Sequence, residues 1–209
     1  MKLYDYVLSG NCYKVRLLLH FLDIKCTLEP VDFYPGRAHK SPSFRRINPL
    51  EQLPVLELDD GKTRICDSQA ILIYLAHKFD PSRHWFPVNE PEKLGCVVQW
   101  LTFANCITAA SSRARLHDML GYTCDITAAR AHAHRAFRHL EDHLCHQEFN
   151  GINWLAGAQP TLADVACFPY TCLAGDGGID IFIYPAIQRW LRRFATLPRF
   201  HPMPGINIR

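Results

Sequence analysis

Apolar and polar residues alternate near the N-terminus in a pattern that predicts strands separated by a helix. Residues 2–7 alternate with the period of a strand, and residues 12–22 carry apolar side chains at helical spacing. A second strand is predicted over residues 25–32, where Pro30 favours an edge position because proline cannot donate a ladder hydrogen bond. Residues 34–48 are polar and basic and predict a loop. This part of the chain therefore predicts a strand–helix–strand unit.

The next segment predicts a hairpin and a helix. Pro54 precedes a strand-like alternation over residues 55–58, and a second short strand is predicted over residues 62–66 after an Asp-Asp-Gly turn. Asp67 and Ser68 then stand at the start of an apolar helical run, where such residues act as N-caps. The order strand, helix, strand, hairpin and helix is the layout of a thioredoxin-like α/β domain.

Two local features of this segment predict a binding site for a small peptide. A proline directly before a strand favours a cis peptide bond, which leaves the backbone groups of Leu53 open to an extended ligand. The helix start at Ser68 presents N–H groups that attract a carboxylate. We therefore expect a small peptide with a free carboxylate to bind here.

The second half of the chain predicts helices only. Residues 80–91 are rich in proline and turn-forming residues, which indicates a domain boundary. Long helices are predicted over residues 92–120 and 125–148, and shorter ones over residues 161–173 and 184–195.

The predicted fold class is therefore α/β followed by all-α. We expect a thioredoxin-like domain over residues 1–79, a linker over residues 80–91 and an all-helical domain over residues 92–209. Thr161 and Asp164 resemble a capping box at the start of a helix, which is a structural signal rather than a catalytic one.

Composition and charge narrow the classes of function. The 209 residues are 48% hydrophobic and 21% charged, as in a globular protein. The net charge of +3 is spread along the chain, so no basic stripe for nucleic acid is predicted. Nine cysteines, an odd number without a Cys-x-x-Cys pair, predict free thiols in a reducing compartment. Because neither a targeting segment nor a run of membrane-spanning length is evident, we expect a cytoplasmic protein without membrane contact.

Three motifs give the chain a resemblance to a known family. They are Asn-Pro-Leu-Glu-Gln-Leu-Pro-Val-Leu at residues 48–56, Asp-Ser-Gln-Ala-Ile-Leu-Ile-Tyr-Leu at residues 67–75, and Trp-Leu-Ala-Gly-x-x-Pro-Thr-Leu-Ala-Asp at residues 154–164. With the two-domain layout, they resemble the cytosolic glutathione transferases, and the N-terminal serine and cysteine resemble those of bacterial-type members. The resemblance implies glutathione as co-substrate, no cofactor and no metal, a hydrophobic electrophile as second substrate, and a homodimer.

The resemblance also implies roles for the peptide-binding residues. The backbone of Leu53, before Pro54, is expected to pair with the cysteinyl part of glutathione, and Asp67 with Ser68 is expected to hold the γ-glutamyl end. The glycine carboxylate needs a cation or an amide. The residues proposed for it, by their place beside the predicted site, are His39, Lys40 and Gln52.

Three residues at the first helix start are candidates for stabilising the glutathione thiolate. Ser9 resembles the serine of the serine-type classes, Asn11 offers an amide, and Cys12 resembles the cysteine of bacterial members that form a mixed disulfide with glutathione. Cys12 is also readable as a small buried hydrophobe. Tyr4 and Tyr6 precede the turn and are predicted to be packing residues.

For the second substrate, the first long helix offers a stripe with a spacing of four residues, which is also typical of a core-facing stripe. Its members are Phe103, Ile107, Ser111, Arg115 and Met119. An unpaired buried Arg115 would be costly, which favours a cleft for a polar or anionic substrate.

The second long helix is rich in histidine. His139, His143 and His146 share one face, and the first two have the spacing of a metal-chelating pair. The apolar residues lie roughly opposite, so we interpret this as a solvated face and predict no metal cofactor.

The resulting hypothesis is a glutathione transferase that conjugates glutathione to an electrophilic small molecule. Two alternatives stay open at this point. One is a glutathione-dependent thiol oxidoreductase or peroxidase that uses Cys12, and the other is a non-catalytic protein that binds glutathione or hydrophobic ligands.

Overall fold

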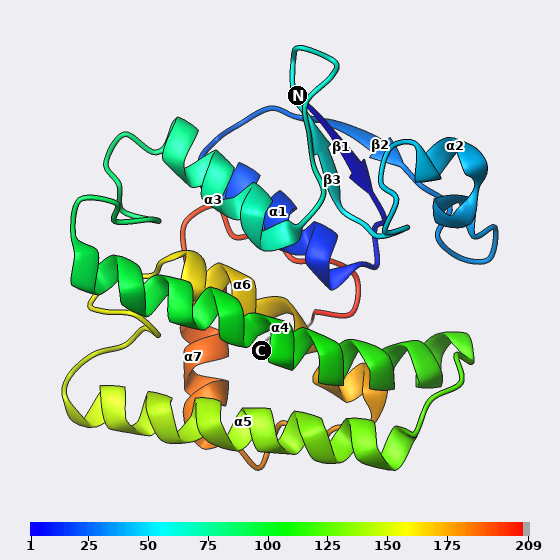
Figure 1. Cartoon of the computed structure of the whole chain (residues 1–209). Helices are drawn as coiled ribbons and strands as arrows, with labels where there is room; N and C mark the ends of the chain where they lie inside the picture. Colours follow the sequence, from blue (N-terminus) through cyan, green and yellow to red (C-terminus); the bar gives the residue numbers. More distant parts are fainter. Residues whose placement is uncertain (207–209) are drawn as a thin grey trace. The chain divides into compact units, whose positions relative to one another are not determined.

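The computed structural model describes residues 1–206 (Figure 1). Within it the chain divides into two compact units, the first formed by Met1–Pro81 and the second beginning at Ser82.

The first unit is a four-stranded sheet with two main helices. Its elements are β1 (Lys2–Asp5), α1 (Gly10–Phe21), β2 (Thr27–Pro30), the 3-10 turn η1 (Ala38–Lys40), α2 (Pro42–Arg45), β3 (Val55–Glu57), β4 (Arg64–Ile65) and α3 (Ser68–Phe79). The strand order is β2-β1-β3-β4, with β1 parallel to β2 and antiparallel to β3. The mixed sheet is the predicted thioredoxin-like arrangement, and β2 lies at an edge, as Pro30 predicts.

The core of this unit lies between the sheet and the helices α1 and α3, which contact each other. Leu3 and Leu56 face each other across the β1–β3 pair and are fully buried. Leu18 of α1 and Leu72 of α3 are also fully buried. The apolar stripes read from the sequence are therefore the faces that these helices bury.

The segment predicted as a loop over residues 34–48 contains η1 and α2, so that prediction was wrong in part. Ser41 caps α2, because its Oγ accepts a hydrogen bond from the Phe44 N–H at 3.1 Å, and Pro42 occupies the first helical turn. Phe44 is buried against the sheet cluster that contains Val55. Helices of three or four residues are too short to give a periodic signal, which is why the pattern missed them.

The second unit is helical. Its elements are α4 (Pro91–Leu120), α5 (Ile126–Phe149), α6 (Leu162–Cys172), the 3-10 turn η2 (Leu173–Gly177) and α7 (Pro185–Ala195). The long helix α4 contacts α5, α6 and η2, and Figure 1 shows α4 and α5 lying side by side. Within the described residues, the unit holds no strand beyond an isolated bridge between Trp154 and Gly157.

The predicted capping box begins α6. Thr161 Oγ1 accepts a hydrogen bond from the Ala163 N–H at 3.2 Å, and the Asp164 carboxylate accepts from the Thr161 N–H at 2.9 Å. Asp164 also accepts from the Leu155 N–H at 3.1 Å and from Trp190 Nε1 at 2.9 Å. One fully buried carboxylate thus joins α6, the preceding loop and α7, which confirms its structural role.

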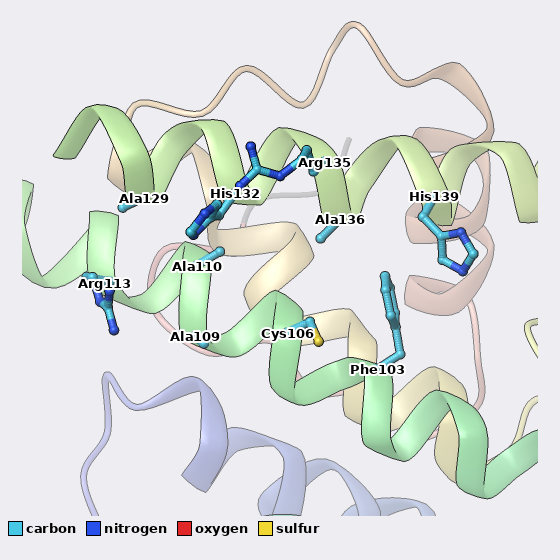
Figure 2. A pocket seen from close by; sticks show the side chains of 10 residues that line it. All are labelled: Phe103, Cys106, Ala109, Ala110, Arg113, Ala129, His132, Arg135, Ala136 and His139. Atoms are coloured by element: carbon cyan, nitrogen blue, oxygen red, sulfur yellow. The ribbon is translucent and has the colours of Figure 1, made fainter. Parts of the chain in front are cut away.

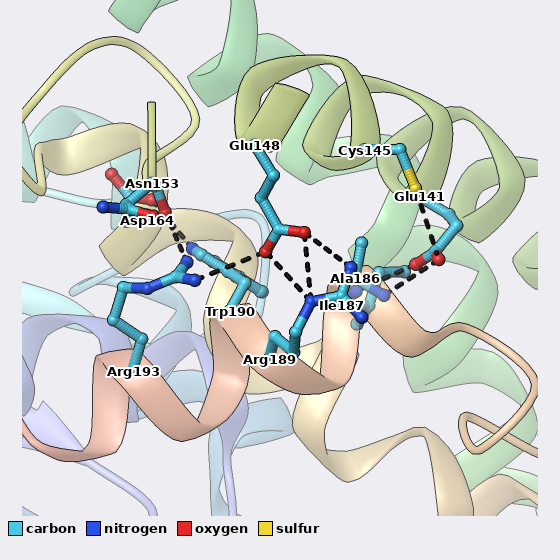
Figure 3. A network of polar contacts seen from close by, with 10 residues as sticks. All are labelled: Glu141, Cys145, Glu148, Asn153, Asp164, Ala186, Ile187, Arg189, Trp190 and Arg193. Carbon is cyan, nitrogen blue, oxygen red and sulfur yellow. Dashed lines mark hydrogen bonds and ion pairs between the residues drawn. The ribbon is translucent and has the colours of Figure 1, made fainter. Parts of the chain in front are cut away.

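Two further carboxylates fasten α7 to α5 (Figure 3). Glu141 accepts hydrogen bonds from the backbone N–H groups of Ala186 at 2.9 Å and Ile187 at 2.8 Å, and so caps the N-terminus of α7. Glu148 pairs with Arg189 and Arg193, one turn apart on the same helix.

The helix α4 corrects the expectation that no segment of the chain has membrane-spanning length. An 18-residue window within its 30 residues reaches a mean hydropathy of 1.3, so its length and composition alone would allow it to cross a membrane. The core helix of a soluble protein meets the same criterion. In this unit α4 buries Trp100, Ala104 and Ile107 and contacts three other elements.

Candidate functional site

The peptide bond between Leu53 and Pro54 is cis, as predicted. Among residues 1–206, neither the N–H nor the carbonyl of Leu53 has a hydrogen-bond partner. The preceding turn is held by the buried Asn48, whose Nδ2 donates to the Gln52 carbonyl at 2.9 Å and whose Oδ1 accepts from the Leu50 N–H at 3.0 Å. A fixed turn therefore presents one unpaired backbone position at the start of β3.

The start of α3 forms a second polar position. Asp67 is the exposed N-cap, and its Oδ1 accepts a hydrogen bond from the Ala70 N–H at 2.9 Å. Ser68 is 4% exposed, and its hydroxyl donates to Oε1 of the buried Gln69. A carboxylate and a hydroxyl therefore stand together at a helix N-terminus, where the helix dipole favours a negative ligand group.

The turn η1 brings His39 into the core of the first unit. The ring of His39 is 3% exposed and stacks on Phe33 with centroids 4.1 Å apart. Burial, with Lys40 and Arg37 adding to it, lowers the pKa of His39, so the imidazole is neutral at neutral pH. His39 therefore does not supply the positive charge expected of it for a carboxylate. Lys40 and Gln52 are exposed.

His39 Nδ1 nevertheless has no hydrogen-bond partner within the part of the chain that the structure describes. A buried ring nitrogen without a partner is costly, and a ligand group or water would satisfy it. A neutral imidazole can contribute a hydrogen bond to a ligand even though it brings no charge.

The start of α1 holds the three candidates for thiolate stabilisation. Ser9 is the N-cap, and its Oγ accepts a hydrogen bond from the Cys12 N–H at 3.2 Å. Asn11 has a buried Oδ1 that lacks a partner among the described residues. Cys12 is fully buried, and this burial, with the charge of Asp5, raises the pKa of its thiol to about 12. Cys12 is thus in an environment that disfavours a thiolate.

Tyr4 and Tyr6 both pack against aromatic side chains, as expected, although β1 ends at Asp5 and Tyr6 lies just beyond it. Tyr4 lies edge-on to Phe44 and donates its hydroxyl hydrogen to Glu57 at 3.3 Å. Tyr6 packs against Phe33 with ring centroids 5.3 Å apart.

The five residues predicted to line a second-substrate site do not share one environment. Ile107 and Ser111 are 1% exposed, Phe103 is half-buried, and Met119 is 47% exposed. A spacing of four residues turns by about 40° at each step of an α-helix, so five such residues spread over roughly 160° of the surface.

Arg115 has a partner that the sequence did not reveal. Its Nε donates to Asp176 of η2 at 2.8 Å, inside the same unit. The cost of an unpaired buried guanidinium therefore no longer argues for an anionic second substrate. The assignment of the whole stripe to substrate binding stays a prediction.

The interpretation of the histidine face was wrong for His143. This side chain is half-buried, bonds through Nε2 to the Leu155 carbonyl at 2.8 Å and packs against Trp100 at 4.5 Å. His139 is exposed and contacts Phe103, and His146 is exposed. No group of three or more His, Cys, Asp and Glu side chains able to hold a metal is found among residues 1–206.

Comparison with known proteins adds an independent observation. A sequence model described as the glutathione S-transferase N-terminal domain matches residues 3–83, and one for the C-terminal domain matches residues 111–171. A glutathione S-transferase structure from Pseudomonas fluorescens Pf-5 superposes with a TM-score of 0.87 at 32% identity, covering 97% of this chain and 98% of that one. The chain belongs to the glutathione transferase family. The thioredoxin-like and helical domains are the family's fold.

Relatives within the glutathione transferase family carry different names. Glutathione S-transferase 2 of Anopheles gambiae is 28% identical over 96% of this chain and 91% of its own length. Glutathione S-transferase theta-1 of Mus musculus is 26% identical over 92% of this chain and 81% of its own. The disulfide-bond oxidoreductase YfcG of Escherichia coli is 26% identical over 91% and 88%. Family membership therefore leaves the reaction type open.

Sequence reasoning missed three residues that shape this site. Asn48 fixes the turn before Leu53, Gln69 accepts the Ser68 hydroxyl hydrogen, and Phe33 supports His39. The Asn-Pro pair at residues 48–49 is a turn signal that could have identified Asn48. The stacking of Phe33 on His39 depends on the fold and leaves no local signal. Gln69 adjoins Ser68 in sequence, but the contact between their side chains follows no recognised sequence pattern.

Proposed function

We propose that the protein conjugates glutathione to an electrophilic small molecule by stabilising the glutathione thiolate. The observation that carries this proposal is the unpaired backbone of Leu53 in the same small domain as the Asp67–Ser68 helix start. The Leu53 backbone can pair with an extended peptide, and the Asp67–Ser68 helix start presents a carboxylate and a hydroxyl to its γ-glutamyl end.

In this proposal glutathione is held at both ends. The N–H and carbonyl of Leu53 pair with its cysteinyl residue, and Asp67 binds the γ-glutamyl amino group. The Ser68 hydroxyl turns from Gln69 and donates its hydrogen to the γ-glutamyl carboxylate. The glycine carboxylate is met by Lys40 and Gln52. His39 adds a neutral hydrogen bond through its unpartnered Nδ1.

Catalysis then requires a lower pKa for the bound thiol. An ordinary thiol has a pKa of about 8.5, and lowering it by two units takes about 2.7 kcal/mol of preferential stabilisation of the thiolate. A hydroxyl or amide donor at the start of α1, with the helix dipole, can supply this. Ser9 and Asn11 are the donors proposed for that role, and backbone N–H groups at this helix start are the alternative.

The relative named as a disulfide-bond oxidoreductase favours one second candidate function, glutathione-dependent disulfide exchange. If this exchange used Cys12, its thiolate would attack one sulfur of a disulfide, form a mixed disulfide and release the other sulfur as a thiolate. The full burial of Cys12 and its raised pKa oppose that step. We therefore place this function second to conjugation.

The remaining parts of the proposal follow from the family. We propose a cytoplasmic homodimer with a role in detoxification, a hydrophobic electrophile as second substrate, and α4 as the helix that contacts this electrophile.

Calorimetry of glutathione binding tests the proposed site. Ser68→Ala should weaken binding by about 1–3 kcal/mol, because the charged ligand group loses its buried hydroxyl partner. Ser43→Ala, which changes an exposed serine of the same unit, serves as control and should bind like wild type. Equal affinity of Ser68→Ala and wild type would remove Ser68 from the site.

A conjugation assay with a panel of aromatic halides and activated alkenes separates the functions. Turnover that requires glutathione and survives in Cys12→Ala supports the transferase. Binding of glutathione without turnover of any electrophile or small disulfide would instead leave a non-catalytic binding protein.

A further inference from the structure

Residues 6–9 connect β1 to α1 and place Ser9 at the start of the helix. The Ser9 N–H donates to the Tyr6 carbonyl at 2.9 Å, and the Ser9 Oγ accepts from the Cys12 N–H at 3.2 Å. Because Oγ is the acceptor in that bond, the hydroxyl hydrogen can still be donated to a ligand. A hydroxyl stabilises a thiolate only when it points at the sulfur, so its effect depends on how firmly this connection is held.

One guanidinium holds the connection from the second turn of α1. Arg16 Nη2 donates to the Val7 carbonyl at 2.9 Å, and Nη1 donates to the Tyr6 carbonyl at 3.4 Å and pairs with the Asp5 carboxylate. Helical side chains point toward the N-terminus of their helix, so Arg16 reaches back over the first turn. One side chain thus fastens three consecutive residues of the segment that leads to Ser9.

The pair formed by Arg16 and Asp5 is largely removed from solvent, since the two side chains are 13% and 10% exposed. Both charges act at the start of α1. Burial contributes most to the raised pKa of the Cys12 thiol, the charge of Asp5 raises it further, and the charge of Arg16 lowers it. A thiolate bound at the same helix start would be subject to the same two charges. The guanidinium therefore offsets a carboxylate that by itself would disfavour the thiolate.

Another arginine of the first unit supplies a matched comparison. Arg64 pairs with Glu57 of the neighbouring strand at 2.9 Å and donates to the carbonyl of Arg46, the C-cap of α2. Both partners lie outside residues 6–9. Replacing Arg64 thus removes an arginine–carboxylate pair from the same sheet without touching the segment that carries Ser9.

We propose that Arg16 is a positioning residue for the glutathione thiolate, because it holds the connection that carries Ser9 and offsets the charge of Asp5 at the helix start. Arg16 acts through these two residues rather than by touching the sulfur. The inference rests on the function proposed above and deepens it, since it assigns a further residue to the thiolate site of that reaction. Lysine is an incomplete substitute, because its ammonium lacks the planar fork of N–H donors.

The first test is the pH titration of the thiolate absorbance of bound glutathione in full-length protein. Arg16→Gln should lower the ratio of thiolate to thiol at pH 7 about tenfold relative to the wild-type complex. Arg16→Lys should lower it by less, because lysine keeps a positive charge beside Asp5 without the two-pronged contact. Arg64→Gln should titrate like wild type.

Turnover with an aromatic halide separates positioning from a general loss of structure. At pH 7 the kcat of Arg16→Gln should fall about five- to tenfold, in line with the smaller thiolate fraction. Glutathione affinity, measured by calorimetry, should change less than about twofold, since the two ends of the peptide hold the ligand. The deficit in kcat should disappear at alkaline pH, where the bound thiol is ionised in both proteins. A parallel loss of affinity and kcat at every pH would indicate a merely structural role and would overturn the proposal.

The remaining outcomes separate this inference from the proposed function. A wild-type thiol pKa below that of free glutathione, unmoved in both Arg16 variants, would refute the role of Arg16 and leave the proposed function standing. A wild-type complex that titrates like free glutathione would refute the proposed function and the inference with it. Arg16→Gln leaves the Asp5 carboxylate without its partner, so circular dichroism checks its fold. If it is unfolded, the folded Arg16→Lys decides, and a wild-type titration in that variant would refute the proposal.

Discussion

Replacing Asp164 with alanine should destabilise the helical unit more than any surface substitution. Burial raises the pKa of this carboxyl to about 6, against the lowering by its N–H partners, so it is ionised and accepting at pH 7.5. It accepts from the N–H groups of Thr161 and Leu155 and from Trp190 Nε1. Alanine leaves all three buried donors without an acceptor.

Each unsatisfied buried donor costs about 1–3 kcal/mol, and we expect about 4 kcal/mol in total because water entering the vacated space offsets part of the loss. For a chain of this length, that corresponds to a fall in Tm of about 8–16 °C. The stability of Asp164→Asn should lie between that of the wild type and that of Asp164→Ala. Its Oδ1 keeps the Leu155 and Trp190 bonds, whereas its amide NH2 faces the Thr161 N–H.

Thermal and urea unfolding, followed by far-ultraviolet circular dichroism, measures these differences. Asp118→Ala is the control, because this carboxylate lies at the surface with Arg130 and its loss should leave the transition unchanged. A loss of less than about 1 kcal/mol in Asp164→Ala would refute the reasoning that this carboxylate holds α6, α7 and the intervening loop together.

Three further predictions concern Cys12, Glu148 and the proposed homodimer. Cys12→Ala should leave glutathione conjugation at the wild-type rate, because the buried thiol has a raised pKa; a large loss of turnover with intact folding would restore a chemical role for it. Glu148→Gln should lower stability at pH 7 by less than about 1 kcal/mol. Because Arg189 and Arg193 lower the pKa of Glu148, the stability difference should be present above the unfolded pKa of this carboxyl and should vanish as the pH falls through its folded pKa. A difference that persists in acid would contradict the ion-pair account. Light scattering at micromolar concentration should give twice the mass of the chain, whereas a monomeric mass would contradict the proposed homodimer.

Signals carried by adjacent residues allowed much of the fold to be predicted. Pro54 predicted the cis bond, Asp67 the start of α3, and Thr161 with Asp164 the start of α6. In each case the physical cause is local, since a cap or a proline acts on groups within four residues.

Features that depend on distant partners could not be predicted in this way. Arg115 pairs with Asp176, which lies 61 positions later in the sequence. His143 was expected to be solvated, but it packs against Trp100 and forms a hydrogen bond with the Leu155 carbonyl. The hollow between α4 and α5, lined by residues such as Phe103 and His139 (Figure 2), likewise needs residues from two helices whose facing surfaces only the folded unit defines. Periodicity identifies which residues share a face, and packing decides what that face meets.

The measurement that tests the central claim most directly is the pH titration of bound glutathione, followed by the ultraviolet absorbance of its thiolate. The account predicts that binding shifts the apparent pKa of the thiol well below the value of about 8.5 for a free thiol. It also predicts that Ser9→Ala or Asn11→Ala returns the pKa toward that value with little change in affinity. A wild-type titration that coincides with that of free glutathione would contradict thiolate stabilisation, and with it the proposed transferase mechanism.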